Sequence, residues 1–396
     1  MIDGNQHPAK VEPSPALRLA GGAATLMLAM GIGRFAYTPI LPLMQADTGL
    51  GDAAAGTLAA VNYLGYLLGA IGCGHIHGSR MAWLRASLAA SLISTAGMAL
   101  TTDVIAWGTL RLISGLASAG LFILATAIVL EDTHGAARRA GWHYAGVGLG
   151  IALSGVVVMN LPPNLSWRGA WLVLGAIAAA LALLAWAGVR PAAHPPTTVA
   201  PTTIAPPASR PDALMRMAAA YFLEGAGYIV SATFLVAILK RDPATAAIAP
   251  WSWVLVGLAA APSSLLWTAI SRRTGLFTAL VAVYVLQAIG IALPALGGGG
   301  AAALAGAVLL GGTFIAAVSL TFGLAGQLAP GRTQQSTARL TALYGVGQIA
   351  GPLVAGVVAE RTGSFAWPLV GAGLLVAMAA ALVLAAASSA RGDRKR

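Results

Sequence analysis

The sequence predicts an all-α integral membrane protein with twelve transmembrane helices. Hydrophobic residues fill 58% of the 396 positions, only 9% are charged, and the mean hydropathy is +0.80. Soluble domains carry about 25% charged residues, so this composition excludes them. Apolar runs long enough to cross a hydrocarbon core of about 30 Å recur twelve times along the chain.

The twelve runs form two sets of six on either side of a proline-rich segment. The expected spans are 16–44, 53–74, 81–101, 104–130, 140–161 and 168–189, then 213–239, 250–271, 276–296, 301–326, 339–359 and 366–388. Residues 190–212 contain seven prolines, which cannot continue a helix. We therefore expect an N-terminal six-helix bundle over 1–189, a cytoplasmic Pro/Thr-rich linker over 190–212, and a C-terminal six-helix bundle over 213–396.

The basic residues predict the orientation of the spans, because lysine and arginine are retained on the cytoplasmic side of short loops. With the N-terminus inside, seventeen of the 23 fall on cytoplasmic segments and four outside. Both termini are predicted to be cytoplasmic, with an uncleaved first span and no signal peptide. The net charge of +11 is scattered over loop ends, so we expect contact with bilayer lipid and no nucleic acid partner.

Three charged residues lie inside apolar spans: Arg34, Arg111 and Glu224. A charge at the bilayer centre costs at least about 2.5 kcal/mol, so such residues usually face a water-filled cavity and mark a transport path. At about 1.5 Å of rise per residue, both arginines lie about 12 Å from the outer boundary, and Glu224 lies near the midplane. We expect the two arginines at similar depth.

Polar side chains on the surrounding spans could complete a binding site, since such sites are mostly apolar with a few placed polar groups. The candidates are Tyr37, Asn62, Tyr63, Tyr66, Tyr221, Tyr228, Tyr344 and Gln348. We predict substrate binding by Arg34, Arg111, Tyr37, Asn62, Tyr66, Tyr228 and Gln348. For any single tyrosine, a role in helix packing or at the membrane interface explains its presence as well as a role in binding does. Arg111 could be purely architectural, holding backbone carbonyls where glycines let helices approach.

A weak repeat relates the two halves, because GVGLGIALSG (146–155) echoes GVGQIAGPLVAG (345–356) at the same place in each half. Six plus six spans with a long central loop resemble the major facilitator superfamily. The segments GIGRFAYTPILPLM (31–44), NYLGYLLG (62–69), FLEGAGYIVSATF (222–234) and YGVGQIAGP (344–352) resemble its bacterial YbfB/YjiJ-like branch. Arg111 followed by Gly115 matches the superfamily's fourth-helix motif. The loop GCGHIHGSR (72–80) lacks the acidic residue usual there, so we expect no gate built on it.

The resemblance implies a monomeric transporter of the bacterial inner membrane that works by alternating access. It also implies that the first, fourth, seventh and tenth helices line the cavity, and these carry Arg34, Arg111 and Glu224. Two arginines and one carboxylate leave a positive surplus that an anion could complete. We therefore expect proton-coupled transport of a small organic anion. Glu224 is expected to carry the proton, because it is the one of the three whose charge can switch.

Two alternatives remain open at the level of sequence. Proton-coupled efflux of hydrophobic or cationic compounds would need acidic and aromatic lining, against which the arginine surplus argues. A non-transporting membrane receptor is the alternative outside transport.

The sequence argues against an enzyme and against a metal site. Cys73 is the only cysteine, and the loop histidines His75 and His77 have no carboxylate or thiolate neighbours. The chain has neither a nucleotide-binding glycine-lysine loop nor the partners for a hydrolytic triad. We expect no catalytic residue, no metal and no cofactor, with the proton gradient as the energy source.

Overall fold

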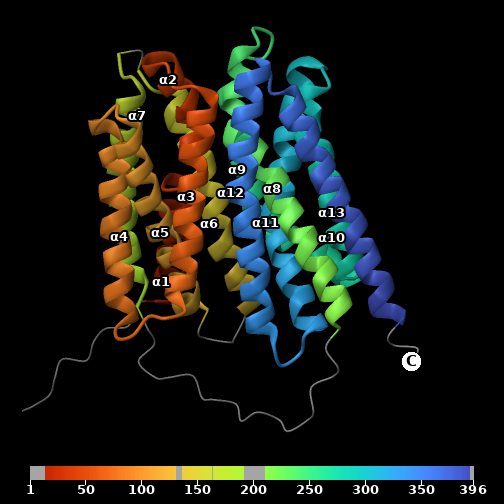
Figure 1. The fold of residues 1–396 in the computed structure, drawn as a ribbon. Helices are drawn as coiled ribbons and strands as arrows, with labels where there is room; N and C mark the ends of the chain where they lie inside the picture. The colour runs from red at the N-terminus through yellow and green to blue at the C-terminus, as the bar shows by residue number, and fades with distance from the viewer. Residues whose placement is uncertain (1–13, 131–135, 163, 191–209, 393–396) are drawn as a thin grey trace, which may run out of the picture.

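The computed structural model describes residues 14–130, 136–162, 164–190 and 210–392. Within this part of the chain, twelve helical spans are long and apolar enough to cross a membrane, which confirms the predicted number. They stand side by side in one bundle with both halves in parallel (Figure 1). Most of the predicted linker lies outside the described residues.

The N-terminal half, residues 14–190, contains the first six spans. They are α1 (Pro15–Leu26), η1 (Met27–Ile32) and α2 (Tyr37–Thr48) as the first span, α3 (Asp52–Cys73), α4 (Arg80–Gly97) with η2 (Met98–Leu100), α5 (Val104–Val129), α6 (Ala136–Met159) and α7 (Trp167–Gly188). The C-terminal half, residues 210–392, contains the others. They are α8 (Pro211–Arg241), α9 (Ala249–Thr274), α10 (Leu276–Ala292) with η3 (Leu293–Ala295), α11 (Gly299–Leu328), α12 (Thr333–Thr362) and α13 (Ala366–Gly392).

The observed boundaries follow the prediction within four residues, except at the start of the eleventh span. That span was expected from residue 339, whereas α12 begins at Thr333. The extra turns read TQQSTAR, whose polar side chains hide a helix from a search for apolar runs. Nothing prevents them from continuing the helix beyond the hydrocarbon core, where water can solvate them.

Glycines allow neighbouring helices to approach closely. A Cβ on Gly115 of α5 would lie 2.0 Å from the Asn62 carbonyl oxygen of α3, a contact that no real side chain makes. Between the halves, a Cβ on Gly257 of α9 would lie 2.2 Å from the Ala152 nitrogen of α6. Backbones in contact at such points are typical of small-residue helix packing in membranes.

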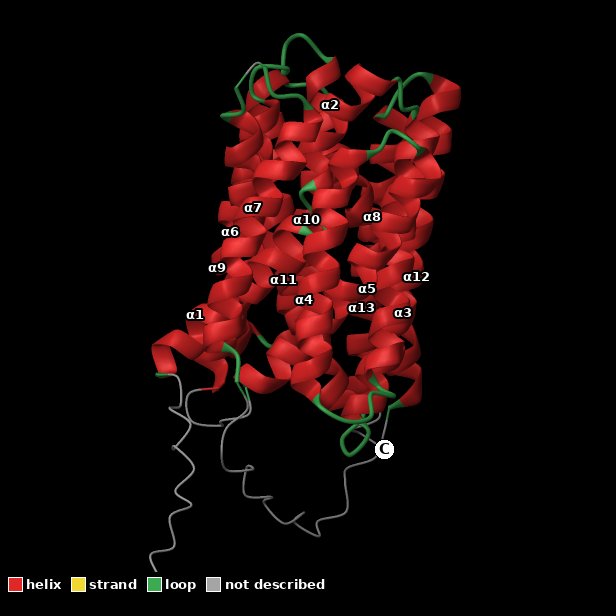
Figure 2. Ribbon diagram, turned by 90° about the vertical axis from the view of Figure 1, so that its left-hand side faces the viewer, coloured by secondary structure: helices red, strands yellow, loops and turns green. Residues whose placement is uncertain are grey.

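Polar contacts between the halves are confined to one end of the bundle. We call the two ends the α2/α3 end, at the loop after Thr48, and the α7/α8 end, where α7 ends and α8 begins; both are visible in Figures 1 and 2. In the described part of the chain, hydrogen bonds between halves lie from mid-bundle to the α2/α3 end.

The outermost of these contacts form what we call the α2/α3 latch, made of Gln45, Asp52, Ala53, Arg241 and Glu360. Arg241 donates to both oxygens of the Asp52 carboxylate, one bond being 2.8 Å long, and Gln45 donates to the same group at 2.8 Å. The Ala53 amide at the start of α3 donates to Glu360 at 2.8 Å. The structure is therefore closed at the α2/α3 end.

We predict that Gly115→Ala destabilises the protein. The added Cβ meets backbone atoms of α3, which can yield only if α3 and α5 separate, and such overpacking costs about 1–3 kcal/mol. Gly371→Ala on α13 is the matched control, because nothing lies within 4 Å of its Cβ. Thermal unfolding in detergent should show a lower melting temperature for Gly115→Ala alone. Equal melting temperatures for the two variants would contradict the close packing.

Candidate functional site

The first span is broken at mid-bundle, and Arg34 lies in the break. The π-helix η1 ends at Ile32, residues 33–36 form turns, and α2 begins at Tyr37. Figure 2 shows this as a short loop segment at mid-height between the helices. Pro39 follows in the first turn of α2 and has no N–H to continue the earlier hydrogen-bonding pattern. The break leaves backbone carbonyls of η1 and the turns without helical partners.

Side chains of α5 supply donors to those carbonyls. Ser118 donates to the Ala29 carbonyl at 2.7 Å, and Ser114 donates to the Gly33 carbonyl at 2.6 Å. Arg111 lies one turn from Ser114 on the same helix face. Because lipid offers no hydrogen-bonding partners, a broken helix is stable only where the protein supplies them.

The guanidinium of Arg111 donates its hydrogen bonds to backbone carbonyls. It donates to the carbonyls of Gly33 and Arg34 at 3.3 Å each and to the Leu58 carbonyl at 3.5 Å. The ring of Tyr37 lies 4.7 Å from its guanidinium carbon, and Arg111 is only 1% exposed. The contact with the Arg34 carbonyl confirms that the two arginines lie at similar depth. These bonds give Arg111 the architectural role that the sequence left open, and its binding to substrate stays a prediction.

Tyr37 and Asn62 belong to the same structural layer. The Tyr37 hydroxyl donates to the Ala55 carbonyl of α3 at 3.1 Å, and the Asn62 amide donates to the Arg111 carbonyl at 2.8 Å. Both side chains are fully buried, so they join α2, α3 and α5 to one another. Only the Asn62 Oδ1 atom is left without a partner.

Arg34 has a different environment, because its side chain reaches the other half. Nη2 donates to Oε1 of Gln348 at 2.8 Å, whereas Nε is buried without a partner. The guanidinium carbon lies 4.2 Å from the ring of Tyr66, 4.7 Å from that of Tyr63 and 5.6 Å from that of Phe35. Among the described residues, no carboxylate forms an ion pair with Arg34, although it is 3% exposed. Its charge is faced by rings and one amide.

The side of the C-terminal half that faces Arg34 is aromatic. Gln348 of α12 donates through Nε2 to the Tyr228 hydroxyl of α8. The Tyr228 ring is stacked with Phe314 at 5.9 Å and with Tyr344 at 5.7 Å, with both interplanar angles 7°. Tyr344 is in turn stacked on Tyr221 at 4.3 Å. We call these four rings the aromatic stack.

Glu224 lies one helical turn from Tyr228 towards the α7/α8 end, about 6 Å by helix rise. It is completely buried, and neither carboxylate oxygen has a hydrogen-bonding partner among the described residues. Gln287 of α10 lies beside it, close enough to pair with the carboxylate after a small rotation. An ion pair with Arg34 or Arg111, which the sequence would have allowed, is absent from this part of the chain.

The structure thus divides the predicted site. It brings together Arg34, Tyr66, Tyr228 and Gln348, places Arg111, Tyr37 and Asn62 in the supporting layer, and sets Glu224 one turn away. Sequence reasoning missed Phe35 and Phe314, whose apolar rings carry no signal in apolar helices. It also missed Gln287, although a lone amide inside the apolar segment VLQAIG was a readable signal.

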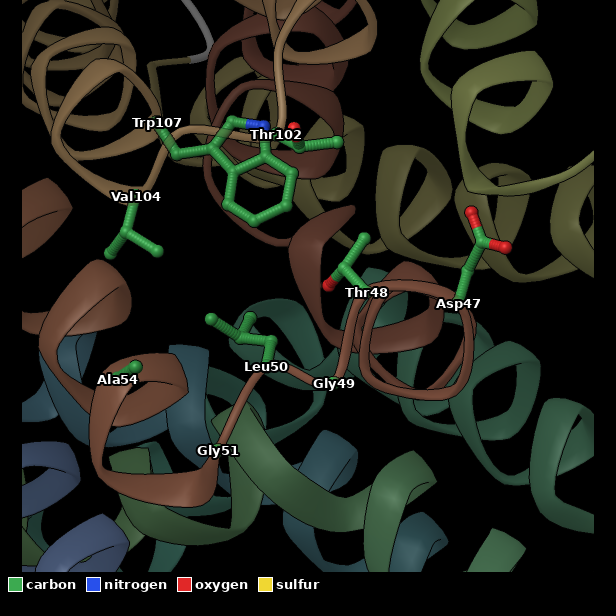
Figure 3. Close-up of a pocket in the computed structure, with 9 residues that line it drawn as sticks. All are labelled: Asp47, Thr48, Gly49, Leu50, Gly51, Ala54, Thr102, Val104 and Trp107. Carbon is green, nitrogen blue, oxygen red and sulfur yellow. The ribbon is translucent and has the colours of Figure 1, made fainter.

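A separate pocket of about 510 Å³ opens at the α2/α3 end (Figure 3). Its apolar wall includes Leu50, Val104 and Trp107, which face one another across it, whereas the Asp47 carboxylate points away. Asp47 accepts a hydrogen bond from Trp167 at 2.6 Å, and the Trp107 indole donates to the Met98 carbonyl at 3.0 Å. Those polar groups are already occupied, and none of the predicted site residues lines this pocket.

Known proteins share both the sequence pattern and the fold. Residues 26–384 match a family model described as "Uncharacterised MFS-type transporter YbfB". A mutant of the nucleoside transporter NupG superposes with a TM-score of 0.70 at 16% identity, covering 94% of this chain and 99% of that one. No curated protein sequence matches the chain.

A bacterial homologue of the human lysosomal transporter Spinster superposes in two solved states. The inward-facing and occupied state gives a TM-score of 0.71 at 15% identity, covering 96% of this chain and 98% of that one. The inward-facing and unoccupied state gives 0.69 at 15% identity, with 96% and 97% covered. These likenesses confirm the major facilitator fold, and the family model spans most of the chain. The protein therefore belongs to the YbfB family of MFS-type transporters, multi-pass membrane proteins that carry out secondary transport.

Proposed function

We propose that this transporter moves a small organic anion across the bacterial inner membrane by proton-coupled alternating access. The observation that carries the proposal is Arg34, a mid-bundle guanidinium at the contact of the two halves that no described carboxylate neutralises. A buried charge without a counterion is strongly destabilising. An anion bound at Arg34 would supply that counterion, and its binding energy would include relief of this cost.

The donors around Arg34 suit a carboxylate. Nε has no partner and Nη2 is held only by an amide that can turn away, so the guanidinium can present two parallel N–H groups, the bidentate geometry that carboxylates accept. The Tyr228 hydroxyl stands behind Gln348 as a further polar group. The alternative from sequence was a cationic or hydrophobic cargo. The same guanidinium would repel a cation, and a hydrophobic cargo would leave its charge without a counterion.

The aromatic rings favour an anion with a flat or unsaturated body. Phe314, Tyr228 and Tyr344 of the C-terminal half present nearly parallel planes, while Tyr63 and Tyr66 lie against Arg34 within the N-terminal half. Stacked arrangements contribute about 0.5–1.5 kcal/mol beyond area burial. A planar carboxylate could therefore contact Arg34 at one end and a ring face at the other.

Glu224 is the proposed proton carrier. An ionised carboxylate is expensive to bury without a partner, so in this closed arrangement the uncharged acid is favoured. Opening of the α7/α8 end to water would let the proton leave. The Gln348–Tyr228 hydrogen bond and one turn of α8 connect Glu224 to the proposed anion site at Arg34, so occupancy of one site can influence the other.

Alternating access needs contacts that hold one end closed and can be released. The α2/α3 latch meets this description, and we propose that the α7/α8 end faces the cytoplasm with both termini. The inward-facing states of the Spinster homologue have the same fold. We further propose that the protein works as a monomer without cofactor.

Arg34→Ala is expected to abolish stabilisation of the purified protein by small carboxylates. Ligand at 100 times its Kd stabilises a protein by about 2.7 kcal/mol, which thermal unfolding detects. Arg34→Lys keeps the charge but lacks the planar guanidinium that donates two parallel hydrogen bonds. Small carboxylates should therefore stabilise this variant only weakly. Arg273→Ala, which removes an equal charge from the exposed end of α9, should respond like the wild type. Stabilisation by organic cations alone, unchanged in Arg34→Ala, would instead favour an exporter.

Glu224→Gln is expected to uncouple transport. The amide cannot release a proton, so proteoliposomes should still exchange the stabilising anion across the membrane but should not accumulate it when a proton gradient is imposed. Counterflow in the same vesicles reports whether the variant folds and binds. Accumulation that still depends fully on the proton gradient would remove Glu224 from the coupling mechanism.

Asp52→Asn is expected to open the α2/α3 end more often, because it removes the charge that Arg241 bridges between the halves. A Thr233→Cys reporter in a Cys73→Ser background lies in the interface, where Thr233 contacts Tyr63. A membrane-impermeant thiol reagent should label it several-fold faster in Asp52→Asn, on the order of the factor of 5 that about 1 kcal/mol represents.

The matched control is Asp103→Asn, because Asp103 is an acidic residue at the same end whose carboxylate caps α5 within its own half. If Asp52→Asn labels no faster than Asp103→Asn, the latch does not hold this end closed.

A further inference from the structure

Four buried polar side chains of the C-terminal half lie together without hydrogen-bonding partners. They are Glu224 on α8, Tyr284 and Gln287 on α10, and Thr321 on α11, which we call the Glu224 cluster. Each is 0% exposed. Both carboxylate oxygens, both amide atoms and both hydroxyl oxygens have no partner within the described residues.

The contacts between these helices explain the grouping. Gln287 lies beside the Glu224 carboxylate, and Thr321 lies beside the Tyr284 hydroxyl, which also faces Glu224. Tyr284 and Gln287 are three residues apart and so share a face of α10. Tyr221, one turn before Glu224 on α8, packs edge-on against Phe322, the neighbour of Thr321. Three helices thus direct polar groups to one buried place.

Six unpaired polar atoms in one buried place call for a bound partner, since buried polar groups in native proteins are nearly always satisfied. With a proton on Glu224 and small rotations, Glu224 can pair with Gln287 and Tyr284 with Thr321, and this arrangement competes with a bound ion. A metal cation can instead be ligated by oxygens from all four side chains at once. Carboxylate, amide and hydroxyl oxygens are the ligands that hard cations select.

We propose that the Glu224 cluster is a binding site for a monovalent metal cation, with Na⁺ as the expected occupant. The cluster contains one carboxylate, so one positive charge balances it, whereas a divalent ion would leave an uncompensated buried charge. The site is separate from Arg34, since Tyr228 and Gln348 lie between them. The inference rests on the proposed function only in taking Glu224 as the coupling residue.

Cation and proton would compete for the same carboxylate, so binding should weaken as pH falls. The titratable groups facing Glu224 are tyrosines: Tyr221 and Tyr228 on α8, Tyr284 on α10 and Tyr344 on α12. α11 contributes the non-titrating Thr321. Within the described residues, no lysine, arginine or histidine is paired with Glu224, so no protein cation takes the place of the ion.

The test is thermal unfolding of the purified full chain in NaCl or KCl, with choline chloride holding ionic strength constant. We expect a saturable rise in melting temperature with metal cation that is larger at alkaline than at acidic pH. Thr321→Val and Tyr284→Phe each remove one ligand oxygen with little change of shape. Each should weaken apparent cation affinity about tenfold, which corresponds to about 1.4 kcal/mol.

Thr313→Val is the matched control on the same helix, because the Thr313 hydroxyl already donates to the Leu309 carbonyl at 2.6 Å. Metal cations should raise the melting temperature of this variant as much as that of the wild type. The site is overturned if choline stabilises as well as metal cations, or if the two cluster variants respond like Thr313→Val. In either case the unpaired atoms are satisfied by one another or by water.

The melting temperatures of the same samples with small carboxylates added separate the two proposals. A cation response that persists in Arg34→Ala while no carboxylate stabilises the wild type would support the cation site and reject the anion substrate. A carboxylate response that requires Arg34, with no metal-cation effect at either pH, would support the substrate and reject the cation site.

Discussion

The break in the first span depends on the donors that α5 presents to it. In the hydrocarbon core, each backbone carbonyl freed from a helix must find another partner inside the protein. Arg111, Ser114 and Ser118 recur along one face of α5 and donate to the carbonyls of the break. Because they hold the broken backbone, the first span can turn at Arg34 and direct that side chain to the other half.

This arrangement gives the two arginines unlike roles although they lie side by side. The guanidinium of Arg111 is surrounded by carbonyl oxygens, which share its charge and fix its position. The guanidinium of Arg34 has a single polar partner, and that partner belongs to the opposite half. Movement of the halves therefore changes the environment of Arg34 and leaves that of Arg111 intact.

The contacts that close the α2/α3 end are individually weak, which suits a reversible change. Arg241 is 45% exposed on its side chain, and ion pairs of this kind contribute about 0–1 kcal/mol each. Close backbone approach at Gly257 gives the halves an additional surface on which to move. Binding of the proposed anion at Arg34 would have only to exceed such small differences to shift the balance between two alternating states.

The sequence by itself determined the twelve spans and the similar depth of the two arginines, because the bilayer imposes a local rule on length and polarity that can be read one segment at a time. Only the tertiary structure decided which arginine is occupied by backbone, that Glu224 has no ion partner among the described residues, and that Phe314 and Gln287 belong near the site. These facts depend on contacts such as that between Arg34 and Gln348, 314 residues apart. Hydropathy carries no information about a partner so distant, since it records the solvent of a residue and not its neighbours.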